Sequence, residues 1–330
     1  MANYLVVGGA GYIGSHMVRT LIERGHQVTV LDDLSKGHAA SVPAEILVKG
    51  DLGNRALLDD LFSQRSIDCV MHFAAFSLVG ESVDEPLAYY RNNTARPVEL
   101  LDAMKHAGVD RFIFSSTAAT YGEPVRLPID EDHPTAPTNP YGRSKRFVEH
   151  MLDDCEIAWG LRSVRLRYFN AAGAHPKGDI GEDHSPESHL VPLLLQVALG
   201  QRDKISIFGT DWDTRDGTCI RDYVHICDLA RAHVLAAEHL ADGGDTRTFN
   251  LGCEEGTSVR EMIDVTRQVT GHAIPAVDAP RRPGDPARLV ASSARIRAEL
   301  GWAPEFDSPE QIIRTAWRWH ESHPQGYATP

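Results

Sequence analysis

The stretch YLVVGGAGYIGSHMVRTLIERGHQVTVLDD, residues 4–33, decides the fold of this 330-residue chain. Its first four residues form an apolar run that stops at glycine, which predicts a short buried strand. Apolar residues then recur at helical spacing, and a second apolar run over residues 27–31 ends at Asp32 and Asp33. A strand, a glycine-rich turn, a helix, a strand and an acid, in this order, are typical of a dinucleotide-binding unit.

The glycine-rich turn follows the pattern Gly-x-x-Gly-x-x-Gly, for which a plain turn is the alternative interpretation. Glycines let a pyrophosphate approach the backbone, and the helix that follows presents its N-terminus to the charge. We therefore expect cofactor contacts from Gly8, Gly11, Tyr12, Ile13 and Gly14. Asp32 should accept hydrogen bonds from the adenosine ribose. Asp33 beside it would repel a 2'-phosphate, which favours NAD over NADP, whereas Lys36 leaves NADP open.

Strands and helices keep alternating as far as Asn170, and the longest predicted helix runs from about Pro86 to His106. This alternation predicts a Rossmann-type, doubly wound parallel sheet that is covered by helices on both faces. Beyond Asn170 strands and helices no longer alternate regularly, so we expect a smaller, irregular α+β lobe that binds the substrate. The expected domains are residues 1–170 and 171–330, with parts of about 218–252 returning to the first domain.

Small or polar residues follow several of the predicted strands at their carboxyl ends. Ligands of open parallel sheets collect at that edge. We therefore expect cofactor contacts from Asp51, Leu52, Phe73, Ala74 and Ala75, with Asp51 near the adenine. Thr117 ends the strand before the next predicted helix, where its hydroxyl is suited to share a proton. Simple turn or capping chemistry is the alternative for Thr117.

The next helix carries Tyr141 and Lys145, which lie four residues apart and so project from the same face. Asn139 and Pro140 suit the helix start, as cap and first-turn residue. A fixed ammonium one turn away favours the phenolate, so we expect Lys145 to lower the pKa of Tyr141 from about 10 toward neutral pH. The pair predicts a general base beside a redox cofactor. An ordinary amphipathic helix is the alternative.

The composition excludes several classes of function. A net charge of -13 argues against nucleic acid or an anionic membrane as a partner. Five scattered cysteines without Cys-x-x-Cys spacing fit a cytoplasmic protein, and no run is apolar enough to predict a signal peptide or a membrane span. None of the 16 histidines sits in His-Glu-x-x-His spacing. His184 and His189 are five apart, off one helical face, so no metal site is predicted.

Taken together, these motifs resemble the extended short-chain dehydrogenase/reductase superfamily and, within it, the UDP-glucose 4-epimerase family. The resemblance runs from Tyr4 to about Trp302. It is strongest in four stretches, GYIGSH (11–16), VGES (79–82), YFNAAG (168–173) and RDYVH (221–225). It implies an isomerase that interconverts UDP-galactose and UDP-glucose through transient oxidation at sugar carbon 4 by bound NAD. A homodimer is also implied.

The resemblance further implies roles for individual residues. Tyr141 is the expected base, Lys145 the nicotinamide ribose contact, and Thr117 stands where members have serine or threonine. Asn92 and Phe169 join the expected cofactor contacts. The UDP-sugar is expected at Thr117, Tyr141, Asn170, His189, Leu190, Phe208, Arg221, Arg282 and Asp285. The two arginines suit bidentate contacts to a diphosphate.

Some positions depart from the family pattern. Ser77 stands where many members have lysine, Asp33 replaces a usual asparagine, and His189 stands where some have asparagine. Leu289 lies near the position that gates sugar size, which leaves N-acetylated sugars open. Thr117 is followed by Ala118 rather than by the Asp-Glu pair of dehydratases, which argues against dehydration. The alternatives are a 4-epimerase of another UDP-sugar (N-acetylhexosamine, pentose or uronate) and a non-enzymatic NAD-sensing protein.

Overall fold

The structure is a computed structural model that describes residues 1–282 and 285–328. Its largest element is a seven-stranded sheet in which neighbouring strands are parallel, in the order β11-β6-β5-β4-β1-β2-β3. The strands are β1 (Asn3–Val7), β2 (Gln27–Asp32), β3 (Leu47–Lys49), β4 (Cys69–His72), β5 (Arg111–Ser115), β6 (Arg162–Tyr168) and β11 (Arg247–Leu251). Strands β2 and β3 follow β1 on one side of the sheet, whereas β4 lies on the other side of β1. This change of side opens a crevice at the carboxyl ends of β1 and β4.

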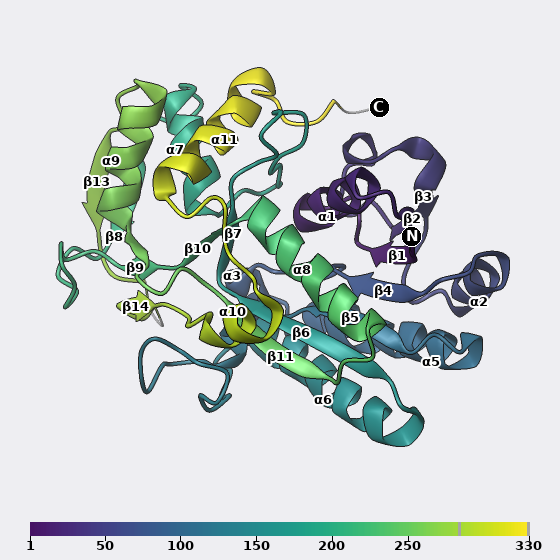
Figure 1. Ribbon diagram of the computed structural model, residues 1–330. Coiled ribbons are helices and arrows are strands. Elements are labelled where there is room, and N and C mark those ends of the chain that lie inside the picture. Colours follow the sequence, from purple (N-terminus) through teal and green to yellow (C-terminus); the bar gives the residue numbers. More distant parts are fainter. Residues whose placement is uncertain (283–284, 329–330) are drawn as a thin grey trace.

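Helices cover both faces of this sheet (Figure 1). One face packs against α1 (Tyr12–Glu23), α8 (Ile226–Ala241) and α10 (Ala294–Leu300). The other packs against α2 (Arg55–Gln64), α5 (Arg96–Ala107) and α6 (Pro140–Trp159). Strand residues alternate between two apolar cores, so Val6 joins the first and Leu5 and Val7 the second. The predicted doubly wound sheet is confirmed.

The expected helix from about Pro86 to His106 is interrupted. The segment consists of α4 (Pro86–Tyr90), a π-helical turn over Arg91–Ala95, and α5. Pro97 has no N–H to donate to the carbonyl of Asn93, so the regular ladder cannot continue there. The buried Asn93 side chain exchanges two hydrogen bonds with the backbone of Phe76, at 2.8 and 2.9 Å. This turn holds the loop after β4 in place.

A smaller lobe gathers around α7 (Leu190–Ala198), α9 (Val259–Thr270) and α11 (Pro309–Ser322), which share one apolar core. Figure 1 shows these helices grouped beside the parallel pair β8 (Ile205–Phe208) and β13 (Ala276–Ala279). Short strands complete the lobe: β7 (Asn170–Ala172) pairs with β10 (Tyr223–His225), and β9 (Ile220–Arg221) lies between β12 (Thr257–Ser258) and β14 (Arg288–Leu289). The remaining helices are α3 (Val79–Asp84) and short 3-10 turns at Ala39–Ser41, Ala44–Ile46 and Ala118–Thr120.

The strand expected over residues 221–225 is divided at Asp222. The buried Asp222 carboxylate accepts backbone N–H groups of Cys253 at 2.7 Å and Ala291 at 2.9 Å. Because the side chain binds two other segments, β9 and β10 join different sheets on either side of it. Of the loop expected at residues 281–285, residues 283–284 lie outside the described part of the chain.

Candidate active site

A cavity of about 1840 Å³ lies along the carboxyl edge of the large sheet and extends to the smaller lobe. Its volume exceeds the usual range of about 300–1,000 Å³ for a single drug-sized ligand. The cavity lining includes most of the cofactor residues predicted from sequence: Gly8, Gly11, Tyr12, Ile13, Gly14, Asp32, Asp33, Leu52, Phe73, Ala74, Ala75, Asn92, Lys145 and Phe169. Asp51 is not in the lining and instead forms an ion pair with Arg96 at 2.7 Å.

The glycine turn approaches its surroundings too closely for side chains at two positions. Gly8 has φ of 77°, and an added Cβ would lie 2.4 Å from the backbone nitrogen of Ala74. A Cβ on Gly14 would lie 2.1 Å from the carbonyl oxygen of Gly8. At Gly11, by contrast, the nearest atom would be 3.5 Å away, an ordinary contact. Gly8 and Gly14 are therefore required by packing, whereas Gly11 leaves open space beside the cavity.

Gly14→Ala should therefore lower the free energy of unfolding by about 1–3 kcal/mol, the usual cost of overpacking. Gly11→Ala should change the free energy of unfolding by less than about 1 kcal/mol. It should nevertheless weaken NAD binding, since Gly11 lines the cavity. Denaturant unfolding and NAD titration of both variants would separate the two effects. Equal loss of stability in both would contradict this assignment.

The acidic end of the cavity is held by backbone and arginine contacts. Both Asp32 oxygens accept backbone N–H groups, from Ala10 at 2.9 Å and Leu34 at 2.8 Å. These bonds fix the carboxylate, and burial raises its pKa. Arg96 lines the cavity and bridges Asp33, at 3.7 Å, to Asp51. Arg96, which no sequence motif predicted, offsets the charge of these acids.

Tyr141, Lys145 and Thr117 all line the cavity. The Asn139 side chain accepts the N–H of Gly142 at 2.9 Å and Pro140 occupies the first turn, so the predicted start of α6 is confirmed. Thr117 has two roles at once. Its hydroxyl caps the following 3-10 turn by accepting the N–H of Ala119 at 3.1 Å, and it acts on the Tyr141 phenol by lowering the pKa of that group.

The electrostatics of this group differ from the prediction. Desolvation raises the pKa of Tyr141, and the hydrogen bond with Thr117 only partly opposes it. Burial also lowers the pKa of Lys145 to about 7, partly opposed by Glu149. Its ammonium donates to the carbonyl of Ser115 at 2.8 Å. In the protein alone the pKa of Tyr141 is therefore shifted opposite to the expected direction, because burial dominates. Lowering of this pKa by Lys145 beside bound NAD stays a prediction.

A buried ion pair lies one helical turn beyond Lys145, and the sequence analysis missed it. Arg167 on β6 donates to both oxygens of Glu149, at 2.9 and 2.6 Å. Ser116 donates to the same carboxylate at 2.7 Å and Arg146 at 2.9 Å. Glu149 is fully buried and its pKa is lowered, since these partners outweigh burial. The network ties α6 to the ends of β5 and β6.

On the side of the smaller lobe, the cavity lining includes five residues predicted to bind the sugar nucleotide: Asn170, His189, Arg221, Arg282 and Asp285. Arg221 lies 3.4 Å from Asp285 and also donates to the carbonyl of Pro286 at 2.9 Å. Leu190 and Phe208 are not in the lining. The Phe208 ring lies under the Arg282 guanidinium at 3.8 Å, so it supports that arginine from behind. The departures Ser77 and Leu289 both line the cavity.

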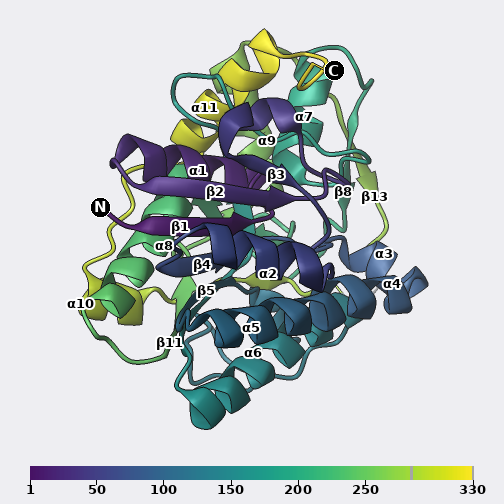
Figure 2. The ribbon, with the colours of Figure 1, turned by 90° about the vertical axis from the view of Figure 1, so that its right-hand side faces the viewer.

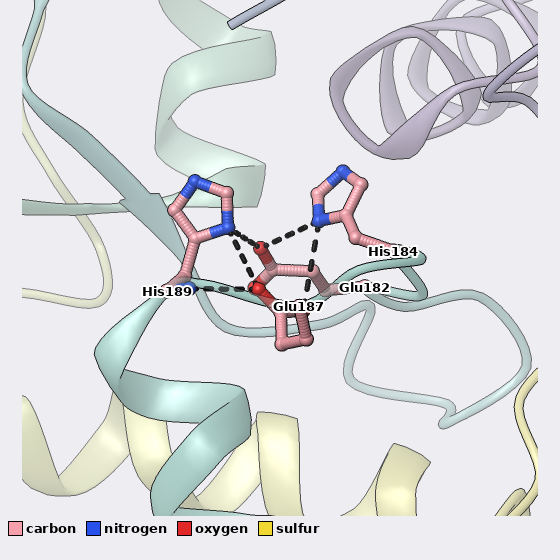
Figure 3. A group of neighbouring side chains, drawn as sticks. All are labelled: Glu182, His184, Glu187 and His189. Carbon is pink, nitrogen blue, oxygen red and sulfur yellow. Dashed lines mark hydrogen bonds and ion pairs between the residues drawn. The ribbon is translucent and has the colours of Figure 1, made fainter. Parts of the chain in front are cut away.

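One further group in the cavity wall was not predicted. Glu182, His184, Glu187 and His189 lie together on the loop before α7 (Figure 3). Burial disfavours charge on both imidazoles, but the two carboxylates outweigh it and raise the pKa of His184 to about 9 and that of His189 to about 10. The sequence analysis separated the two histidines by helical spacing, which does not apply in a loop.

Comparisons with known proteins identify the family of this chain. The model of the NAD dependent epimerase/dehydratase family matches residues 4–252. A UDP-glucose 4-epimerase of Halalkalibacterium halodurans is 58% identical over 98% of this chain and 97% of its own length, and one of Streptococcus mutans is 53% identical over 98% of each. A crystal structure of a UDP-glucose 4-epimerase has a TM-score of 0.98 at 52% identity, covering 99% of this chain and 100% of its own. The enzyme from Brucella ovis in complex with NAD has a TM-score of 0.94 at 47% identity, covering 96% of this chain and 98% of its own. The chain therefore belongs to the NAD dependent epimerase/dehydratase family, among its UDP-glucose 4-epimerases.

Proposed function

We propose that this chain is an NAD-dependent isomerase that interconverts UDP-galactose and UDP-glucose. The observation that carries the proposal is that Tyr141, Lys145 and Thr117 line the same cavity as the glycine turn and two arginines. Near-full-length relatives that are named UDP-glucose 4-epimerase support the same activity. The fixed Asp32 carboxylate and its acidic neighbour Asp33 favour NAD over NADP.

The residues of the chain supply binding and proton transfer. The glycine turn, Asp32 and Lys145 would hold NAD, which would supply reversible hydride transfer at sugar carbon 4. Tyr141 accepts the proton of the hydroxyl on carbon 4 and gives it back, and Thr117 shares its hydrogen bond. Lys145 contacts the nicotinamide ribose and adds positive charge beside the phenol. Arg221 and Arg282 hold the diphosphate of UDP while the sugar turns over.

The glycine turn, the strand-end residues, Asn92 and Phe169 are proposed cofactor contacts, and Asn170, His189 and Asp285 proposed substrate contacts. Leu190, Phe208 and Asp51 do not line the cavity, and we propose that they act by supporting residues that do. We also propose the division into residues 1–170 and 171–330, with residues of 218–252 in the first domain. Two observations support it: α8 packs on the large sheet and β11 pairs with β6.

The decisive experiment is incubation of the purified protein, with NAD and no other redox partner, with UDP-galactose. UDP-glucose should appear, and the same equilibrium mixture should form when the reaction starts from UDP-glucose. Absence of conversion by protein that binds NAD would remove the proposal and favour the NAD-sensing alternative.

A second substrate class is favoured by Leu289. This residue lines the cavity and, like Phe169, packs against the apolar cluster of Ala118, Tyr121 and Ile129; leucine is intermediate in size between tyrosine and a small residue. A structurally similar protein is the UDP-Glc/GlcNAc 4-epimerase of Campylobacter jejuni, with a TM-score of 0.86 at 40% identity. UDP-N-acetylglucosamine should therefore be tested beside UDP-glucose, and a Leu289→Tyr variant should discriminate more strongly against it.

We propose that the chain forms homodimers and works in the cytoplasm. Apolar side chains are exposed on neighbouring helices of one face, with Leu87 of α4 72%, Val98 of α5 47% and Phe147 of α6 49% exposed. Figure 2 shows α5 and α6 side by side there. A twofold axis would bury such a patch against its own copy. All five cysteines are free, as in a reducing compartment. No helix in the described ranges is long and apolar enough to cross a membrane.

Phe147→Glu should shift the protein from dimer to monomer, because it places a charge in the apolar patch. Light scattering coupled to size-exclusion chromatography would measure the mass. Val125→Glu is the control, since Val125 is also exposed but lies in the loop before α6. A dimer that survives Phe147→Glu unchanged would place the contact elsewhere.

A further inference from the structure

We propose that Glu182, His184, Glu187 and His189 bind one divalent cation of the zinc class, which fixes the loop that forms this wall of the cavity. The inference does not rest on the proposed function, although it shares His189 with the proposed substrate contacts. It concerns the loop between β7 and α7, which precedes the helix at Leu190. Figure 3 shows the four side chains converging from this one loop.

The geometry matches a four-coordinate shell. His184 Nδ1 lies 3.2 Å from Glu182 and 3.6 Å from Glu187, and His189 Nδ1 lies 3.0 Å from each. One ligand atom from each of the four residues falls within 4.8 Å of all the others. Zinc bonds of about 2.0–2.1 Å in a tetrahedron separate neighbouring ligand atoms by about 3.3 Å. A small inward movement of each side chain would therefore complete the shell.

Charge and ligand type favour the same cation. The Glu182 and Glu187 side chains are only 4% and 6% exposed. No lysine or arginine pairs with either carboxylate in the ranges that the structure describes, so imidazoles are the only cationic side chains paired with these two buried carboxylates there. A divalent cation would balance them with both histidines neutral. Imidazole ligands suit zinc and other transition metals, whereas calcium and magnesium prefer oxygen ligands alone.

The surroundings of the cluster explain what a cation would do. The Glu187 carboxylate already accepts the backbone N–H groups of Ser188 and His189, both at 2.7 Å, which orients it toward the imidazoles. The His184 ring meets the edge of Tyr12, in the cofactor-binding turn, with centroids 6.1 Å apart. The carbonyl of Asp183, between two of the ligands, lies 3.0 Å from His38 Nε2. A bound cation would thus lock the loop of the smaller lobe against the dinucleotide-binding turn.

The experiment uses the full chain without a histidine tag, stripped with a chelator and dialysed against Zn²⁺ alone. Elemental analysis should find one zinc per chain, and zinc should raise the melting temperature. Co²⁺ in its place should give the visible absorption of a tetrahedral site without a thiolate charge-transfer band, which separates this cluster from the five cysteines. No zinc bound above the background, or a thiolate spectrum, would overturn the proposal and leave the four residues as an ion-pair network.

Two variants test the ligands. His184→Gln and Glu187→Gln keep the side chain close to its original size. Loss of a residue that only hydrogen-bonds to a metal ligand weakens metal binding by roughly 10–100-fold, and each of these variants should weaken zinc binding by more than that. His106→Gln is the matched control, because His106 pairs with Asp102 at 3.6 Å on the surface and should leave zinc binding unchanged. Melting temperatures in chelator report whether each variant folds. Folded variants that retain one tightly bound zinc would refute the site.

Discussion

Tyr141→Phe should lower the turnover of UDP-galactose by about 10²–10⁴-fold while NAD remains bound. The change removes a single oxygen, which is the group proposed to accept and return the proton of the sugar hydroxyl. Phenylalanine keeps the ring and its packing against Tyr89, whose centroid lies 6.5 Å away. The cavity should therefore keep its shape, and the loss should fall on kcat rather than on NAD affinity. Steady-state kinetics with NAD titration would measure both.

Tyr121→Phe is the matched control for this experiment. Tyr121 is also a buried phenol, and it donates to Asn250 at 2.7 Å, but it does not line the cavity. Loss of that hydrogen bond should cost about 1 kcal/mol of stability and leave turnover within a few-fold. If Tyr141→Phe lost no more activity than Tyr121→Phe, another group would have to be the base.

Arg167→Met should lower the free energy of unfolding by about 3–5 kcal/mol, because it leaves the fully buried Glu149 without its bidentate partner. Ser116 and Arg146 would remain, but neither replaces a paired guanidinium held in the core. Denaturant titration at a fixed NAD concentration would measure the difference.

The double variant Arg167→Met with Glu149→Met separates the ion pair from simple packing. Removing both charges should recover much of the lost stability, since an apolar pair carries no desolvation cost. A double variant as unstable as Arg167→Met alone would show that the network contributes through shape rather than charge.

The local units of the fold could be predicted from sequence because their signals are local. The strand, turn and acid of residues 4–33 follow from apolar periodicity and glycine spacing, and the start of α6 follows from Asn139 and Pro140. The π-helical turn before α5 was not predicted, although Pro97 was its visible signal. The break at Asp222 depends on the N–H groups of Cys253 and Ala291, which no local pattern brings to it.

The candidate site could likewise be predicted from sequence only where its signals are local. Motifs located the glycine turn and the residues Tyr141 and Lys145, because chemistry fixes their spacing. The pKa of Tyr141 could not be predicted, since it depends on how much protein surrounds the phenol. Arg96 and the four residues of the loop before α7 were missed because their partners come from folding in three dimensions rather than from a repeat along the chain.

The edge strand β11 has a consequence for synthesis of the protein. It pairs with β6, yet residues 169–246 must be translated between the two strands. At about 5–20 residues per second, the ribosome needs about 4–16 s for that segment. During this interval the nascent chain lacks β11, and β6 presents an unpaired edge that a neighbouring nascent chain can join. Mispairing between incomplete chains is therefore the expected hazard of synthesis until β11 covers this edge.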